Sequence, residues 1–342
     1  MSTAMRTGLR RLGRSAYWVA AGCGWLALAL FTVWALAALW LDVQPSWLHW
    51  PLTATYAVGL VAVAVMVRRR ALAAALCAAG ALIVLGWWLT LQPSNDRYWQ
   101  NDVAILPYAD IEPQRVTVHN IRNCEYRSEM DFDVRHYDKT FDLDKLHAVD
   151  LFLVYWGSPH IAHTMFSFGF DGGDQLCISI ETRKEIGEEY SALRGLFRQY
   201  ELMYVVGDER DLVRLRTNYR QGEDVYLYRL RATPENRREF LLSYLRYVNS
   251  LRERPEWYNA VSTNCTTAVR AQRAVVDRAP WDFRMLVNGH LDELLYERGI
   301  ITTDLPFPEL RERSHINARA RAAGESPQFS KLIREQLPGL SP

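Results

Sequence analysis

Two kinds of hydrophobic pattern divide the chain. The first ninety or so residues contain three long apolar runs, at residues 17–41, 52–67 and 71–91. A helix needs about 20 apolar residues to cross the hydrocarbon core of a bilayer, so these runs predict three membrane-spanning helices. The first run is too long for the apolar part of a signal peptide and is followed by further apolar segments, so we interpret it as a span.

After residue 92 the apolar segments become short and alternate with polar residues. Residues 151–156 (LFLVYW) predict a buried strand. Residues 163–170 and 175–181 are two runs of alternating residue type on either side of a Gly-Gly turn, which predict a β-hairpin. Residues 200–206 and 225–231 predict two more strands.

Two helix starts follow these strands. Thr233 before Pro234 is a favourable N-cap and predicts a helix to about residue 251, and Asn264 predicts a second helix with Cys265 in its first turn. The order of strands and helices indicates an α+β domain. We therefore divide the chain into a membrane anchor (1–91), an outer domain (92–310) and a basic C-terminal tail (311–342).

Charge sets the orientation of the spans and excludes some functions. The chain has 40 basic and 39 acidic residues, a net charge of +1. Residues 1–91 carry seven arginines and one acid. Four of the arginines precede the first span, and the other three (68–70) lie between the second and third spans. Basic residues beside spans stay in the cytoplasm, so the loop around residues 42–50 and everything after 91 are predicted to lie outside. Basic residues confined to span ends do not indicate nucleic-acid binding, and spans without interior acids, His or Lys do not indicate transport.

The candidate chemistry lies in the outer domain. Of five cysteines, Cys23 and Cys77 lie within spans, whereas Cys124, Cys177 and Cys265 lie outside, where disulfides persist. Three is an odd number, so at least one thiol is free or pairs between chains. Whether Cys124 and Cys177 form a disulfide is left undecided by the sequence. We select Cys265 as the free one, because the amides and dipole of a helix N-terminus favour the thiolate.

A thiol nucleophile needs a base, and His163 is our candidate. It begins a strand whose Phe-bearing face is expected to be buried, so the imidazole is expected on the opposite face. Across the hairpin we expect Ile180 and Thr182 on that side, with Glu181 adjacent if the strand bulges, and we choose Glu181 as the group that orients the imidazole. An ordinary hydrogen-bonded strand histidine is the alternative.

Other interpretations carry less weight. A zinc site would use His160 and His163 with Glu181, His136 or His147, but no helix brings the two imidazoles together, so no metal is expected. The Asp-Gly-Gly-Asp segment at 171–174 is better explained as a hairpin turn than as a calcium loop. Arg210, Arg214 and Arg216 are expected on a solvated helix face. No cofactor-binding motif is present, and no cofactor is expected.

The His-bearing strand start HIAHTMFSF (160–168) followed by the helix start NCTT (264–267) resembles the circularly permuted branch of the NlpC-type papain fold, to which lecithin:retinol acyltransferase belongs. The similarity is greatest to the periplasmic domain of the lipoprotein N-acyltransferase Lnb family. It covers roughly residues 143–274 and includes SIETR at 179–183 and the stretch 195–206. In that family the domain precedes a membrane region, whereas here the spans come first.

The resemblance implies a function. Cys265 would be the nucleophile and His163 its base, forming an acyl thioester from a phospholipid and passing the acyl group to an amine such as a lipoprotein N-terminus. The protein would then be a multi-pass inner-membrane protein with a cytoplasmic N-terminus and a periplasmic thiol domain that acts as an acyltransferase or acyl hydrolase. Two alternatives remain, a cell-wall amidopeptidase that uses the same Cys-His pair and a binding module without activity.

Overall fold

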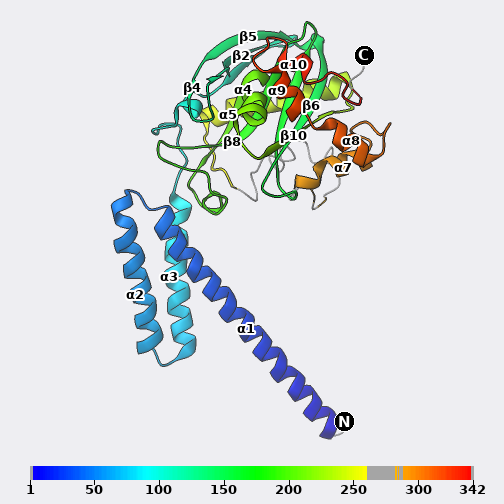
Figure 1. Cartoon of the computed structure of the whole chain (residues 1–342). Coiled ribbons are helices and arrows are strands. Elements are labelled where there is room, and N and C mark those ends of the chain that lie inside the picture. Colours follow the sequence, from blue (N-terminus) through cyan, green and yellow to red (C-terminus); the bar gives the residue numbers. More distant parts are fainter. Residues whose placement is uncertain (1–2, 260–281, 283, 285–287, 340–342) are drawn as a thin grey trace. The chain divides into compact units, whose positions relative to one another are not determined.

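The computed structural model describes residues 3–259, 282, 284 and 288–339. It divides into two compact units (Figure 1). The first consists of Met1–Gln92 together with Phe197–Gln199, and the second of Pro93–Leu196 and Tyr200–Pro342. Each unit is described by itself below.

The first unit is helical. Its helices are α1 (Thr3–Leu41), α2 (His49–Met66) and α3 (Arg70–Thr90), and the 3₁₀ turn η1 (Ser46–Leu48) precedes α2. Three stretches are long and apolar enough to cross a membrane, namely Trp18–Leu41, Ser46–Met66 and Arg70–Thr90. The three predicted spans are therefore confirmed in length and composition. The middle one begins earlier than predicted, because a proline in the first helical turn, here Pro51, breaks no helical hydrogen bond.

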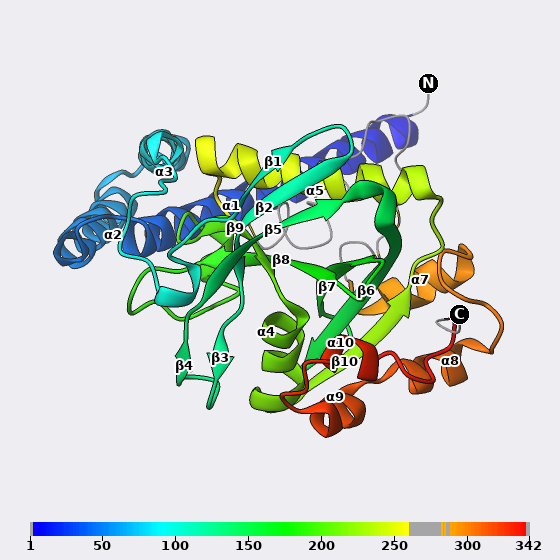
Figure 2. The same ribbon diagram turned by 90° about the horizontal axis from the view of Figure 1, so that it is seen from above.

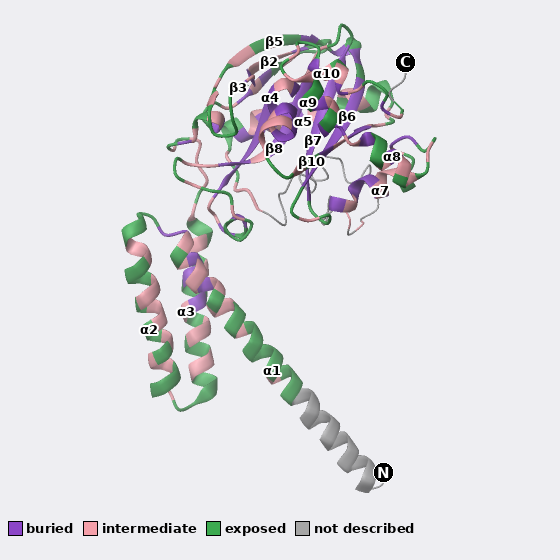
Figure 3. Cartoon of the chain, viewed as in Figure 1, coloured by how far each residue is buried: buried purple, intermediate pink, exposed green. Residues whose placement is uncertain are grey.

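Many described residues of these helices are exposed in the chain by itself (Figure 3), and large apolar residues are among them. Val58 is 67% exposed and Ile83 is 73% exposed, values at which a water-soluble helix would present polar residues. Asp42, the single acid of the segment, accepts a hydrogen bond of 2.7 Å from the Trp88 indole. Such an apolar exterior is what a lipid environment requires.

The second unit is built on a large mixed sheet. Its strand order is β1-β2-β9-β8-β7-β6-β10, with β5 also paired to β2, and all pairs are antiparallel except a short parallel contact of β2 with β9. The strands are β1 (Tyr108–Ile111), β2 (Arg115–Arg122), β5 (His136–Asp142), β6 (Leu146–Trp156), β7 (Ala162–Phe170), β8 (Gln175–Arg183), β9 (Glu201–Gly207) and β10 (Glu223–Arg229). Strands β3 (Glu125–Tyr126) and β4 (Phe132–Asp133) form a separate small hairpin.

Helices cover both faces of this sheet (Figure 2). The long helix α5 (Pro234–Glu253) packs on one face, where residues such as Phe166, Phe168 and Ile178 form the larger apolar core with Leu241 and Leu245. Helices α4 (Glu209–Arg214), α9 (Asn317–Ala323) and α10 (Phe329–Leu332) cover the other face. The described part of the unit also contains helices α7 (Leu291–Glu297) and α8 (Phe307–Ser314) and the short turns η2 (Asn101–Val103), η3 (Leu143–Lys145), η4 (Arg194–Leu196) and η8 (Asn288–His290).

The structure confirms the elements that local patterns predicted. The hairpin of β7 and β8 turns through Gly172 and Gly173, whose φ values of 95° and 92° favour glycine. Thr233 caps α5 by accepting a hydrogen bond of 3.3 Å from the Asn236 amide. The mixed α+β architecture is thereby confirmed. The second predicted helix, from Asn264, lies outside the described residues.

The C-terminal segment that we expected to be a tail is part of the domain core. The side chains of Ile316, Ala320, Phe329 and Ile333 are fully buried against the sheet. The basic residues between them, namely Arg319, Arg321 and Lys331, are at least partly exposed and give the segment its basic, tail-like composition. Sparse apolar residues at helical spacing still suffice to bury one face of a short helix.

Candidate functional site

The candidate base His163 lies at the start of the central strand β7. It pairs in register with Val154 of β6, and its side chain is 9% exposed. Its neighbour Met165 lies opposite Ser179 of β8. Because facing residues of an antiparallel pair point to the same side of the sheet, the register puts His163 on the face that carries Met165 and Ser179.

A hydroxyl and a carboxylate on β8 contact the imidazole. The Nε2 atom of His163 lies 2.7 Å from the Ser179 Oγ and 3.2 Å from Oε1 of Glu181. Ser179 in turn donates a hydrogen bond of 2.6 Å to the same carboxylate oxygen. His163, Ser179 and Glu181 therefore form one connected group on neighbouring strands.

The partners expected for His163 were partly wrong. Ile180 and Thr182 were expected on its side of the hairpin, but the Met165–Ser179 register turns Ile180 into the opposite core, beside Ile178 and Tyr204. The paired residues of β7 and β8 show no bulge, and Glu181 contacts His163 two residues beyond the Met165–Ser179 pair. A shift of one residue in register exchanges the two faces of a strand, and the sequence of the hairpin alone did not determine it.

A buried arginine holds the far side of this carboxylate. The Nη2 atom of Arg216 lies 2.9 Å from Oε1 of Glu181, and its Nη1 atom lies 3.4 Å from Glu223 at the start of β10. Burial by itself raises the pKa of the Glu181 carboxyl, but the charges of His163 and Arg216 and the hydrogen bonds from His163 and Ser179 outweigh it. The net effect holds that pKa well below its ordinary range, so Glu181 is a carboxylate at neutral pH.

Arg216 was expected on a solvated helix face, and this expectation was wrong. Arg216 is 6% exposed and Arg214 is 7% exposed. The segment after α4 continues as one π-helical turn, η5 (Leu215–Tyr219), which packs Arg216 against the sheet. π-Helical turns occur frequently at functional sites. No periodicity argument from the sequence predicts such a turn.

Comparison with known protein families assigns the segment that contains the residues around His163. The family model described as the Lnb N-terminal periplasmic domain matches residues 133–289. The chain carries an Lnb-type periplasmic domain. The matched segment includes His163, Ser179, Glu181 and Arg216, and also Cys265. No curated protein and no solved structure matched the chain.

The Lnb-type domain and the three apolar helices together indicate a membrane protein with a periplasmic domain. The sequence-based resemblance to the Lnb family is thus confirmed for this domain. The cytoplasmic N-terminus and the inner membrane remain predictions, as do the start of the outer domain at residue 92 and the papain-like permutation.

The described cysteines of the second unit are unsuited to nucleophilic chemistry. Cys124 and Cys177 are both free thiols, so the disulfide between them that we left open is not formed. Burial raises the pKa of Cys124 to about 12 and that of Cys177 well above its ordinary value. The thiolate is the reactive form, so neither is a good nucleophile. The remaining candidate, Cys265, lies outside the described residues.

The histidines weighed as zinc ligands do not form a metal site in the described part of the chain. There, no cluster of three or more His, Cys, Asp or Glu side chains has the geometry to hold a metal ion. The Nδ1 atom of His160 lies 3.0 Å from Nε2 of His290, and His163 contacts Ser179 and Glu181 instead.

Sequence reasoning missed two members of the group around His163. Ser179 stands two residues before Glu181, a spacing that puts both side chains on one face of a strand, and this signal was available in SIETR. Arg216 had no local signal, because it is 35 residues away in the sequence and reaches Glu181 only through the packing of η5.

Proposed function

We propose that the protein is a membrane-anchored thiol acyltransferase or acyl hydrolase that works through Cys265 and His163. The observation that carries the proposal is the hydrogen-bonded group of His163, Ser179, Glu181 and Arg216 within an Lnb-type domain, in which Glu181 is partly exposed and the other three residues are buried. A histidine held by a carboxylate that is itself held by another residue is the arrangement of a general base with its orienting group.

The geometry gives each residue a role in the proposal. Ser179 and Glu181 contact Nε2 of His163, which fixes the ring and favours a proton on that nitrogen. The other nitrogen, Nδ1, is then the atom that exchanges a proton with the Cys265 thiol. Arg216 keeps Glu181 ionised and oriented, and the carboxylate in turn stabilises the imidazolium that forms when His163 accepts a proton.

The proposed reaction has two balanced steps. The Cys265 sulfur attacks an ester carbonyl of a phospholipid after His163 has taken the thiol proton; the new S–C bond replaces the C–O bond, and the lysophospholipid leaves with that proton. An amine then attacks the thioester, a C–N bond replaces the C–S bond, and the amine proton returns through His163 to the sulfur. If water replaces the amine, the product is a free fatty acid and the enzyme is a hydrolase.

Two observations support a lipid acyl donor over a cell-wall peptide. The chain has three stretches that are long and apolar enough to anchor the domain at a bilayer. Trp156 and Ile161, which flank the loop before His163, are 40% and 54% exposed, so apolar surface lies close in sequence to the candidate base. An amidopeptidase site would instead need polar groups for the peptide backbone.

The test is acyl transfer from a fluorescent phospholipid to a lipoprotein-derived peptide amine, with the full chain in detergent or vesicles. Cys265→Ala is expected to abolish the reaction, and Cys23→Ala, which removes a thiol from a predicted span, serves as the matched control. Full activity of Cys265→Ala would contradict the proposal. Hydrolysis of cell-wall peptides but not of phospholipid would favour the amidopeptidase alternative.

A further inference from the structure

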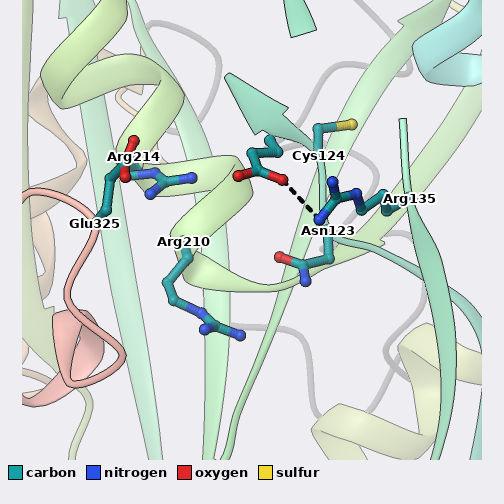
Figure 4. A pocket seen from close by; sticks show the side chains of 7 residues that line it. Asn123, Cys124, Arg135, Arg210, Arg214 and Glu325 are labelled. Carbon is teal, nitrogen blue, oxygen red and sulfur yellow. Dashed lines mark ion pairs between the residues drawn. The ribbon is translucent and has the colours of Figure 1, made fainter. Parts of the chain in front are cut away.

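A second polar site lies apart from the residues around His163. It is a cavity of about 220 Å³ lined by residues from the start of β3, from the segment before β5, from α4 and from the loop after α9 (Figure 4). The lining residues are Asn123, Cys124, Glu125, Arg135, Arg210, Arg214 and Glu325. None of them belongs to the candidate catalytic group, so this cavity is a separate feature.

Arg214 is the unusual member of the cavity. The residue is 7% exposed, its Nε atom is buried without a hydrogen-bond partner, and Arg214 forms no ion pair with any residue in the described part of the chain. Other buried arginines are paired, Arg122 with Asp211 and Arg334 with Glu209. A buried charge without a partner lowers the free energy of unfolding, and a bound anion would offset this cost at Arg214.

The neighbouring arginines keep donors available. Arg135 contacts Glu125 at 2.6 Å through Nη1, the ion pair drawn in Figure 4. Arg210 uses Nε and Nη2 on Asp208, at 3.1 Å and 2.9 Å. A guanidinium has five N–H donors, so both retain some for a ligand. The charges of Arg135 and Arg210 are already balanced, which leaves Arg214 as the uncompensated cation of the cavity wall.

Acidic side chains limit the charge of the ligand. Glu125 is engaged by Arg135, whereas Glu325 is exposed to solvent at the cavity and forms no ion pair with a described residue. These two carboxylates repel a doubly charged anion. An anion with a single charge and several acceptor oxygens satisfies Arg214 with least repulsion, and arginine side chains bind tetrahedral oxyanions through paired N–H groups.

We propose that this cavity binds a singly charged phosphate group, with Arg214 as its principal ligand and Arg135 and Arg210 as secondary donors. Two sources have this chemistry, the phosphodiester of a phospholipid headgroup and free monobasic phosphate. The proposal does not depend on Cys265, because it concerns binding at residues outside the candidate catalytic group.

The experiment is a binding titration of the full chain in detergent with dimethyl phosphate and, separately, with inorganic phosphate at mildly acidic pH, against chloride at equal ionic strength. At a hundredfold excess over Kd, binding is expected to raise the Tm by about 5 °C. Arg214→Gln is expected to lose this shift and the calorimetric binding signal. Arg246→Gln, which removes an exposed charge from α5, is expected to keep both. Binding of dimethyl phosphate alone identifies the phosphodiester as the source, and binding of both identifies free phosphate as sufficient.

Two further variants guard against a purely structural role of Arg214. Without phosphate, Arg214→Met is expected to unfold at the same temperature as the wild type or higher, because it removes an unpaired buried charge. Glu325→Gln is expected to tighten phosphate binding several-fold. Absence of saturable binding to the wild type would overturn the proposal. Lower stability of both Arg214→Met and Glu325→Gln without phosphate would also overturn it, because these two residues would then be each other's partner.

Discussion

The Nε2 atom of His163 lies 3.2 Å from Oε1 of Glu181, and Ser179 contacts both. The two residues lie on adjacent antiparallel strands, on the face opposite the large aromatic core of the domain. Rigid strands therefore determine this contact, which suits a catalytic group whose orientation must be maintained.

Glu181→Gln is expected to lower kcat/KM of acyl transfer about a hundredfold, because a neutral amide holds the imidazole less firmly and does not stabilise the imidazolium. The acidic limb of the pH–rate profile is expected to move to lower pH for the same reason. Kinetics across pH with the phospholipid substrate provide the measurement. Glu239→Gln, an exposed change on α5, is the matched control. An unchanged rate and profile would show that Glu181 does not orient the base.

Arg216→Met is expected to destabilise the domain by about 3 kcal/mol near neutral pH, because it leaves Glu181 and Glu223 together without their shared cation. Burial and mutual repulsion then raise the pKa of these carboxyls in the folded variant. The penalty is therefore present above those raised values and decreases as the pH falls and the carboxyls take up protons.

Urea unfolding of the wild type and Arg216→Met at about pH 7 and about pH 4.5 measures this difference. Arg246→Met is the control and is expected to change stability by less than about 0.5 kcal/mol. A loss for Arg216→Met that is the same at both pH values would show that lost packing of the side chain, and not charge, causes the effect.

Glu201 gives a separate prediction of pH dependence. Burial raises the pKa of its carboxyl to about 7, although Arg97 at 2.9 Å opposes this shift. The folded state thus binds the Glu201 proton more tightly than the unfolded state does. Proton binding by Glu201 therefore stabilises the folded state. This stabilisation is fully present below the carboxyl pKa of the unfolded chain and is lost as the pH rises from there to about 7.

Glu201→Gln, which carries no charge, is therefore expected to gain stability relative to the wild type across this pH range, by at most about 3 kcal/mol. Thermal unfolding of both proteins at several pH values is the measurement. Glu185→Gln, which removes the other carboxylate on Arg97 from a more exposed position, is the matched control. A difference between Glu201→Gln and wild type that does not vary with pH would contradict the expectation.

The C-terminal helices are expected to be essential for stability. Phe329→Ala is predicted to cost about 3–5 kcal/mol, because Phe329 is fully buried against the sheet. Lys331→Ala, on the exposed side of the same helix, is expected to have little effect. Chemical denaturation of both variants tests this difference. Equal stabilities would show that the segment packs loosely, as a tail does.

The sequence was most informative where short-range patterns decide the structure. Uninterrupted apolar runs predicted the spans, and the Gly172–Gly173 turn and the Thr233 cap predicted the hairpin and α5. The strands β1, β2 and β5 were not predicted, because charged and polar residues interrupt their short apolar stretches, although β1 and β2 form a local hairpin. The buried helices α9 and α10 were missed for a similar reason.

The candidate site was predictable only in part. His163 and Glu181 were chosen from residue type and strand position, and the structure brings them together. The register that makes them neighbours depends on the pairing of whole strands, so Ile180 and Thr182 were placed on the wrong face. Arg216 depends on the π-helical turn η5 and on its packing, which no spacing rule predicts.

Intact-protein mass spectrometry of the full chain, after incubation with phospholipid and no acceptor, tests whether Cys265 forms an acyl thioester. We predict a mass increase of one acyl group that neutral hydroxylamine removes, as it does for a thioester, and that persists in Cys23→Ala. The increase is predicted to be absent in Cys265→Ala and strongly reduced in His163→Gln. An acyl adduct that forms equally in Cys265→Ala, or no adduct in the wild type while phospholipid is consumed, would contradict the account.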